Sequence, residues 1–346
     1  MVGTIYRAAV IGLGRIARLH THGYRQIPEI TVVAGADISD EARRTYAETY
    51  GVPALYADYR ELLAREQPDI VSICTWPPLH AEMTVAAAEA AVKAIICEKP
   101  MTTHLADADR MLAACRAAGT FLLINHQRRF QAQHVKAKEL LKSGVIGQLV
   151  EVHATVGGEI EGQAKTDILT SADHAIDLIR FYADDEPVAW VMGQIDRRER
   201  RERYGHPVED AAIGYFRFQS GVRGFVECGD IARPGYCRCR LLGTLGRIEA
   251  MGDRPNTAQQ VLLRAHLTSG WKEFPVAETN PFVEEVRELL RCLEHGGDHL
   301  LSGEQGRATL EIGLAIFESS RLHARIDLPL QQTSFPLQLM IGAGQV

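Results

Sequence analysis

Short apolar runs alternate with helical patterns over the first 125 residues of the chain. The apolar runs predict strands at residues 5–11, 30–36, 70–75, 95–97 and 121–124. Apolar positions at helical spacing predict helices over residues 15–27, 40–50, 78–91 and 103–118. Thr103 should lie near the N-cap of the last helix, with Gly119 just past its end. Strands that are apolar throughout and separated by helices indicate a doubly wound parallel sheet over residues 1–127.

The pattern changes after about residue 127. Runs that alternate polar and apolar residues predict strands at residues 149–156, 189–195, 212–219, 224–228, 238–243 and 247–251. Helices are predicted over residues 132–142, 172–182, 281–294 and 303–324. This succession indicates an α+β domain over residues 128–330 with a large, mainly antiparallel sheet, followed by a C-terminal tail over residues 331–346.

The composition agrees with two globular domains and limits the classes of binding partner. The 346 residues are 46% hydrophobic and carry a net charge of −6, which gives no general attraction to nucleic acid or to anionic membranes. The seven cysteines are an odd number, and no secretory signal pattern precedes them, so we expect free thiols and a cytoplasmic protein. Cys228, Cys237 and Cys239 lack the spacing of a tetrahedral zinc site, and we expect no metal.

A glycine-rich turn lies between the first predicted strand and the first predicted helix. Gly12 permits the tight turn, Gly14 lets the backbone approach a pyrophosphate, and Ala17 lets the helix pack close to the strand. Asp37 follows the second strand, where a carboxylate accepts hydrogen bonds from an adenosine ribose. The context predicts a Rossmann domain that binds NAD, because a carboxylate there repels the 2′-phosphate of NADP. NADP stays open, since Arg43 and Arg44 could offset that repulsion.

A lysine lies at the carboxyl end of the strand predicted at residues 95–97, in the run Cys97-Glu98-Lys99-Pro100. Ligands of doubly wound sheets bind beyond the carboxyl ends of the strands, so Lys99 should face the nicotinamide. A positively charged nicotinamide would lower the pKa of this lysine and make it a competent proton donor or acceptor. The alternative is a surface lysine at a strand end.

These motifs together resemble those of the glucose–fructose oxidoreductase, inositol dehydrogenase and rhizopine-catabolism (Gfo/Idh/MocA) family. The similar segments, in the expected order, are GLGRIARLH at 12–20, TWPPLH at 75–80, CEKP at 97–100, NHQRRF at 125–130, GVIGQL at 144–149, HAIDLIRF at 174–181 and the segment 281–330. The resemblance implies hydride transfer between NAD(P) and a sugar, cyclitol or related polyol. It also implies acid–base and hydroxyl-positioning roles for Lys99 and His174, and imidazole titrates near neutral pH.

Two sets of residues follow from the motifs and the resemblance. The expected cofactor-binding residues are Gly12, Gly14, Arg15, Ile16, Asp37, Thr75, Trp76, His80, Glu98 and Lys99. The expected substrate-binding residues are Arg128, Arg129, Thr170, Asp173 and Asp177. The planar guanidinium groups suit carboxylates and vicinal diols, and Asp177 lies one helical turn after His174.

The chain departs from the family pattern at two positions. Many relatives carry an Asp where this chain has Thr170, and Asp173 or Asp177 would have to substitute for it. Relatives usually carry a Gly where this chain has Val92, so we expect a left-handed, strained backbone there, costing about 1–2 kcal/mol. Substrate specificity should depend on the loops around residues 155–170 and 229–240.

Two other functions stay open, and an assembly is expected. One is a redox-neutral sugar elimination or hydrolysis with tightly held NAD. The other is a regulator that binds NAD(P) without turnover, although Lys99 and His174 argue against it. Apolar residues on both faces of residues 188–192 and 211–216 predict an exposed patch on the second sheet. We therefore expect a homodimer or homotetramer joined through that sheet.

Overall fold

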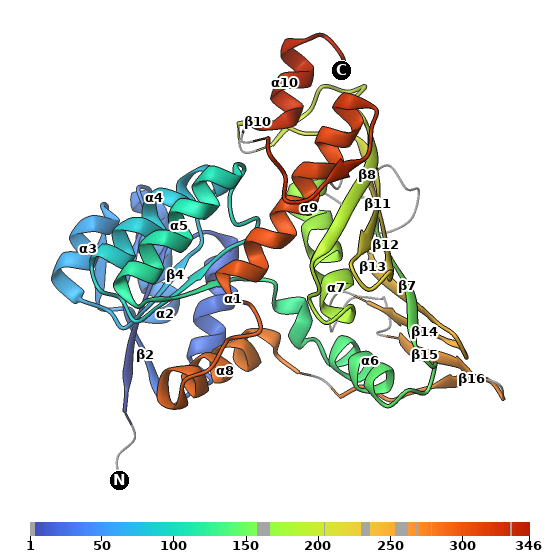
Figure 1. Ribbon diagram of the computed structural model, residues 1–346. Coiled ribbons are helices and arrows are strands. Elements are labelled where there is room, and N and C mark those ends of the chain that lie inside the picture. The colour runs from blue at the N-terminus through green and yellow to red at the C-terminus, as the bar shows by residue number, and fades with distance from the viewer. Residues whose placement is uncertain are drawn as a thin grey trace. The chain divides into compact units, whose positions relative to one another are not determined.

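The computed structural model describes residues 4–157, 167–203, 205–229, 236–252, 262–267, 269–277, 279–332 and 334–346. The chain divides into two compact units, each of which has its own sheet (Figure 1). Unit 1 comprises residues 1–127 and 280–307, and unit 2 comprises residues 128–279 and 308–346. Among the described residues, no helix is both long enough and apolar enough to cross a lipid bilayer.

Unit 1 is a parallel six-stranded sheet in the order β3-β2-β1-β4-β5-β6. Its strands are β1 (Tyr6–Ile11), β2 (Ile30–Ala36), β3 (Ala54–Tyr56), β4 (Ile70–Ile73), β5 (Ala94–Cys97) and β6 (Phe121–Ile124). Its connecting helices are α1 (Arg15–Tyr24), α2 (Asp40–Tyr50), α3 (Tyr59–Glu66), α4 (Pro77–Glu89) and α5 (Leu105–Ala118). The predicted doubly wound Rossmann sheet is therefore confirmed, with its change of strand order between β1 and β4.

Three details of unit 1 differ from expectation. The short β3 and α3 were not predicted. Helix α5 begins after His104, so Thr103 is not its cap. The left-handed residue before β5 is Ala91, with φ of 56°, whereas Val92 is not left-handed and is buried. The expected strain at Val92 was wrong, because the turn takes up its positive φ one residue earlier, at a residue with a smaller side chain.

Residues 280–307 belong to unit 1, although we expected them in the second domain. They contain α8 (Pro281–His295), which packs against α1 so closely that a Cβ added at Gly23 would lie 3.0 Å from Cβ of Phe282. After α8 the chain reaches β6, where the Ile124 N–H donates to the Leu301 carbonyl oxygen at 3.0 Å. Helix α9 (Gly303–Leu322) begins in unit 1 and continues in unit 2.

Unit 2 is built on a mixed nine-stranded sheet in the order β16-β15-β14-β13-β7-β12-β11-β8-β17. The strands are β7 (Leu149–Gly157), β8 (Val188–Asp196), β11 (Ala211–Phe218), β12 (Arg223–Gly229), β13 (Tyr236–Gly243), β14 (Arg247–Met251), β15 (Leu262–Leu267), β16 (Gly270–Glu273) and β17 (Ile326–Asp327). Every pairing in it is antiparallel except that of β7 with β12. The expected mainly antiparallel sheet is confirmed, with β15 and the two edge strands β16 and β17 in addition.

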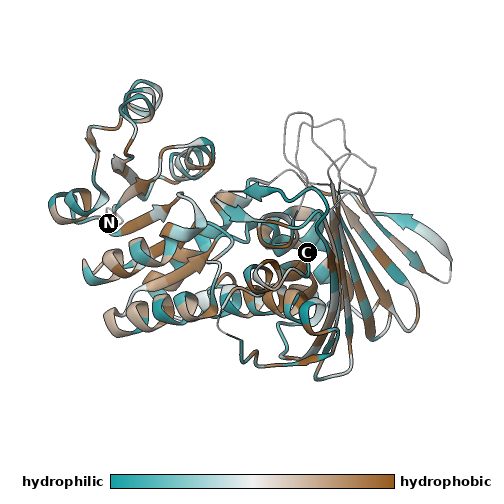
Figure 2. Cartoon of the chain, turned by 90° about the horizontal axis from the view of Figure 1, so that it is seen from above, coloured by the Kyte–Doolittle hydropathy of each residue, from teal (hydrophilic) through white to brown (hydrophobic). Residues whose placement is uncertain are grey.

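Helices cover one face of this sheet. They are α6 (Ala132–Lys142), α7 (Asp173–Tyr182) and the second part of α9 (Figure 1). Strand residues therefore alternate: Val191 and Phe216 are fully buried toward the helices, whereas Met192 and Ile213 on the opposite face are 45% and 57% exposed. The strands of unit 1 are hydrophobic over most of their length, while those of the large sheet alternate in hydropathy (Figure 2).

The predicted tail is not a tail in the structure. It forms α10 (Pro336–Gly342), whose preceding residue Phe335 is only 2% exposed. The Phe335 ring meets the ring of Phe317 on α9 edge-on, with 5.4 Å between the centroids. The buried residues of this segment, Phe335, Pro336, Leu337 and Met340, therefore belong to the core of unit 2.

Candidate functional site

The loop after β1 has the geometry that a dinucleotide needs. Gly12 has φ of 85°, and a Cβ added there would lie 2.8 Å from Cγ2 of Thr75 and 2.9 Å from the backbone of Cys74. Gly14 is the N-cap of α1, and an added Cβ would meet no described atom within 4 Å. No described side chain caps α1, so its first N–H groups and its dipole are directed to this space. Arg15 is exposed and Ile16 half-buried at the start of the helix.

The Asp37 carboxylate lies next to this loop. Its Oδ2 accepts the N–H of Leu13, and its Oδ1 accepts the N–H of Ser39, both at 2.8 Å. Arg43 donates to the backbone carbonyl of Asp37 and pairs with Asp40, so its guanidinium is engaged there. The two N–H donors fix the carboxylate where the first two strands end, as cofactor binding requires.

The loop between β4 and α4 is tied to the lysine-bearing segment by His80. Its Nδ1 lies 3.0 Å from the carbonyl oxygen of Pro100, and its Nε2 lies 3.2 Å from that of Thr75. Burial lowers the pKa of His80, while its contacts to the two backbone carbonyls oppose this shift. His80 therefore contacts both loops from the interior. Trp76, the N-cap of α4, is 58% exposed.

Lys99 follows Glu98 at the carboxyl end of β5. Glu98 is 6% exposed and Lys99 is half-buried. Burial raises the pKa of Glu98, but the hydrogen bond from His20, the charge of Lys99 and the hydrogen bond from Asn125 outweigh it and lower this pKa below its ordinary value. Glu98 is therefore a carboxylate inside unit 1.

His174 lies in the first turn of α7 in unit 2, and it is 5% exposed. The helix follows a π-helical turn, η2 (Ile168–Ala172), which carries Thr170. Asp173, at the start of α7, is also buried, at 3% exposed. Thr170 in η2 and Asp173 at the start of α7 thus lie within four positions before the expected acid–base histidine.

A carboxylate holds Thr170 in place. Asp167 accepts the Thr170 N–H at 2.8 Å and the Thr170 hydroxyl at 2.5 Å. Arg203, from the small hairpin of β9 (Glu202–Arg203) and β10 (His206–Pro207), donates to both residues, at 2.8 Å to Asp167 and 2.6 Å to Thr170. The carboxylate nearest to Thr170 is therefore that of Asp167, and not that of Asp177, which we considered as a substitute. An Asp three residues before a Thr is an N-cap pattern, which is the signal that would have found it.

Glu209, which lies two residues before β11, supports the same turn. Its Oε1 accepts the Ile168 N–H at 2.5 Å, and its side chain is buried. Burial, with Asp167 as the next cause, raises the pKa of Glu209 to about 8. Asp167 and Glu209 thus form a closely placed acid pair behind Thr170.

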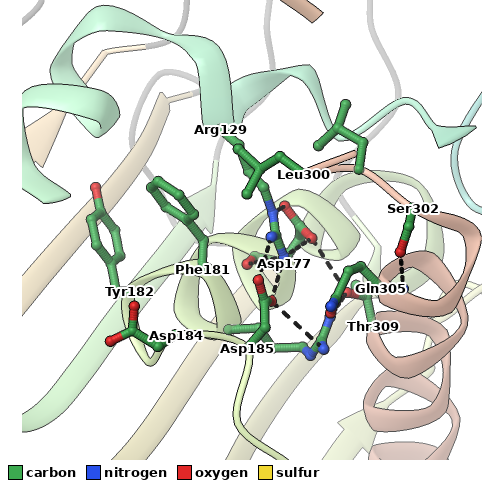
Figure 3. A network of polar contacts seen from close by, with 12 residues as sticks. Arg129, Asp177, Phe181, Tyr182, Asp184, Asp185, Leu300, Ser302, Gln305 and Thr309 are labelled. Atoms are coloured by element: carbon green, nitrogen blue, oxygen red, sulfur yellow. Dashed lines mark hydrogen bonds and ion pairs between the residues drawn. The ribbon is translucent and has the colours of Figure 1, made fainter. Parts of the chain in front are cut away.

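Arg129 and Asp177 are paired with each other inside unit 2. The Arg129 Nε and Nη2 donate to the two oxygens of Asp177 at 2.8 and 2.7 Å, and Nη1 and Nη2 donate to Asp185 at 2.7 and 2.8 Å (Figure 3). The side chains of Arg129 and Asp177 are 0% and 1% exposed. This buried ion pair differs from the substrate contact that we expected, so neither residue is proposed as a substrate ligand. Arg128, the residue directly before Arg129, is half-buried.

The described residues contain no group of three or more His, Cys, Asp or Glu placed to hold a metal ion. The seven cysteines are buried free thiols. The expected specificity loops fall largely on residues 158–166 and 230–235, which lie outside the described residues.

Comparison with known proteins gives two family matches. Residues 6–126 match the oxidoreductase family with an NAD-binding Rossmann fold, and residues 134–249 match the GFO/IDH/MocA C-terminal domain. A myo-inositol 2-dehydrogenase of Thermotoga maritima is 28% identical over 329 residues, covering 90% of this chain and 96% of the relative. An inositol 2-dehydrogenase of Gluconacetobacter diazotrophicus is 30% identical over 275 residues, covering 76% and 79%.

A solved structure supports the same assignment over most of the chain. The crystal structure of an aldose–aldose oxidoreductase from Caulobacter crescentus, complexed with glycerol, superposes with a TM-score of 0.82 at 25% identity. The match covers 94% of this chain and 100% of that one.

Proposed function

The chain belongs to the Gfo/Idh/MocA oxidoreductase family, and on that premise we propose that it transfers a hydride between NAD and a CH–OH group of a sugar, cyclitol or related polyol. One observation carries the proposal: Gly12, Asp37 and Lys99 follow the carboxyl ends of β1, β2 and β5 in one sheet. Open α/β sheets bind their ligands at this edge. The glycine loop and the free N–H groups of α1 fit a pyrophosphate.

The residues have separate tasks in this reaction. When bound, the nicotinamide of NAD supplies the hydride acceptor. The alcohol must lose its hydroxyl proton as the hydride leaves, so a base is needed. We assign this proton transfer to Nζ of Lys99, which accepts the proton as the neutral amine when the alcohol is oxidised and donates it as the ammonium group when the carbonyl is reduced. We assign orientation of the hydroxyl group to the imidazole of His174. The N–H groups of α1 hold the pyrophosphate, and the Asp37 carboxylate holds the adenosine ribose.

A ligand screen followed by an assay tests this function. Sugars, cyclitols and sugar acids, with myo-inositol among them, are screened for thermal stabilisation of the protein in the presence of NAD. We expect at least one polyol to stabilise the protein and to form NADH in proportion to its own oxidation. A protein that NAD neither stabilises nor binds would contradict the proposal.

A redox-neutral reaction is the second candidate, because Thr170 replaces the Asp of many relatives. Its hydroxyl is held by Asp167 and Arg203, so this flank of the site differs chemically from a free carboxylate. Consumption of a sugar with no net NADH would favour an elimination or hydrolysis, and binding without any product would favour a sensor.

Changing Asp37 should change the choice of cofactor. We expect Asp37→Ser combined with Ile38→Arg to raise the affinity for NADPH relative to NADH by about tenfold or more, since repulsion is lost and a charged donor is gained. Ile38 is 93% exposed, so an arginine fits there without disturbing the core. Fluorescence titration measures both affinities. Glu41→Ser, on the exposed first turn of α2, is the control and should leave the ratio unchanged; an unchanged ratio in the double variant would remove Asp37 from its role.

We also propose a homodimer or homotetramer joined through the open face of the large sheet. Trp190, Tyr215 and Phe225 form a row of rings there, with centroids 5.1 and 4.6 Å apart. Met192 and Ile213 lie exposed on the same face. Burial of such an apolar surface favours association, and closed symmetry is its common form.

Light scattering on the eluting protein tests the assembly. We expect a mass of two or four times 38.3 kDa at micromolar concentration, and we expect Ile213→Lys to shift it toward the monomer. Leu322→Lys, which places the same charge on an exposed leucine of α9, is the control and should leave the mass unchanged. A wild-type monomer would refute this assembly.

A further inference from the structure

A chain of buried hydrogen bonds runs through unit 1 and ends at Glu98. The hydroxyl groups of Tyr24 and Ser72 are 2.6 Å apart, and the Ser72 hydroxyl lies 3.1 Å from Nδ1 of His20. Nε2 of His20 lies 2.9 Å from Oε1 of Glu98. In one tautomer of His20, Tyr24 donates to Ser72, Ser72 donates to Nδ1, and the Nε2–H donates to the carboxylate. Nδ2 of Asn125, 3.1 Å from the same Nε2, then donates to the carboxylate and not to the ring. Each hydrogen bond then strengthens the next.

Asn125 supplies a second donor to the same carboxylate. Its Nδ2 donates to Oε1 of Glu98 at 2.5 Å, from the residue directly after β6. The other carboxylate oxygen, Oε2, accepts the backbone N–H of Lys99 at 3.3 Å. Glu98 is thus held from α1 and from β6, and it contacts the lysine next to it.

Glu98 keeps its charge while its titratable neighbours lose theirs. Burial raises the pKa values of three nearby groups, the thiols of Cys74 and Cys97 and the carboxyl of Glu285, and lowers that of the His80 imidazole. All four shifts favour the uncharged form. Glu285, on α8, is fully buried, and neither of its oxygens is hydrogen-bonded to a described residue. The carboxylate of Glu98 is therefore the fixed negative charge of this cluster.

We propose that His20 and Asn125 are positioning residues that act through Glu98 to hold the Lys99 ammonium group beside a fixed negative charge. The proposal rests on the acid–base role proposed above for Lys99. An adjacent carboxylate favours the charged form of lysine, so Lys99 keeps its proton to a higher pH. Three donors on the two carboxylate oxygens of Glu98 also fix the backbone from which the Lys99 side chain extends.

Competitive acetylation measures the effect without substrate or cofactor. The full chain is labelled with acetic anhydride over the pH range in which lysine titrates. Mass spectrometry of the Lys99 peptide gives the midpoint, with exposed Lys142 as the internal reference. We expect Glu98→Gln to lower the Lys99 midpoint by about one pH unit. Glu285→Gln is the matched control, because it changes a buried carboxyl whose raised pKa favours the neutral form. The Lys99 midpoint in this variant should equal that of the wild type.

A pair of His20 variants separates positioning from general loosening of the core. His20→Gln keeps an N–H donor near the position of Nε2 and should retain the wild-type midpoint. His20→Leu removes the donor and should lower the midpoint in the direction of Glu98→Gln, by a smaller amount. This pair decides the question if Glu98→Gln does not fold, as judged by circular dichroism.

Two results would overturn the proposal: a Glu98→Gln midpoint equal to that of the wild type, or equal shifts in Glu98→Gln and Glu285→Gln. The labelling needs no dehydrogenase activity. Failure of the proposed function in the substrate assay therefore leaves this measurement intact, and the reverse also holds.

Discussion

Lys99→Met is expected to lower kcat by about two orders of magnitude or more, the usual scale for losing an acid–base group. Binding of NAD should survive, because the loop at Gly12 and the carboxylate of Asp37 lie at other strand ends of the sheet. His174→Ala should lower kcat on the same scale. The measurements are steady-state rates with the polyol found by the ligand screen, and NADH titration by fluorescence.

Lys93→Met is the matched control for this experiment. Lys93 directly precedes β5, at the strand's opposite end, and pairs with Asp69 at 2.8 Å with 54% of its side chain exposed. Loss of such a surface pair should leave kcat near the wild-type value. Near-wild-type turnover in Lys99→Met or in His174→Ala would remove that residue from the mechanism.

Arg129→Leu should cost unit 2 about 3–5 kcal/mol of stability, since it removes the bidentate partner of Asp177 and of Asp185, although Arg180 remains 3.6 Å from Asp185. Asp177 is 1% exposed, so water cannot replace the guanidinium there. Arg129→Lys should fall between this variant and the wild type, because one ammonium group cannot reproduce the two bidentate pairs. Urea unfolding followed by tryptophan fluorescence measures the loss, since Trp190 and Trp271 lie in unit 2.

Arg65→Leu serves as the comparison for Arg129. Arg65 pairs with Glu61 on α3 with 67% of its side chain exposed, and breaking such a pair should cost less than about 1 kcal/mol. Equal losses in the two variants would mean that the buried network contributes no more than a surface pair.

Features with a local signature could be predicted from the sequence. The turn at Gly12 and the strand end at Lys99 depend on a few neighbouring residues, and both were placed correctly. The π-helical turn before α7 was not foreseen, since its support comes from Glu209 and Arg203, which are far away in the sequence. Asp167 was missed although its capping position was readable.

Long-range pairing explains the other differences. Arg129 meets Asp177 and Asp185 across 48 and 56 positions of sequence, so its residue type suggested a ligand contact while its partners made it structural. Residues 280–307 return to unit 1 because α8 packs on α1 and the following residues reach β6, which no periodicity within that segment reveals.

The discontinuity of unit 1 has a consequence for its synthesis on the ribosome. Residues 1–127 emerge first, but α8, which covers α1, is made only after the whole of residues 128–279. At about 5–20 residues per second, translation from residue 128 to residue 307 takes roughly 9–36 s. During that interval the nascent Rossmann sheet lacks a helix of its own core, and the apolar residues of α1 that α8 will cover stay open to chaperones. The rate at which residues 128–279 are translated therefore determines how long unit 1 remains without α8.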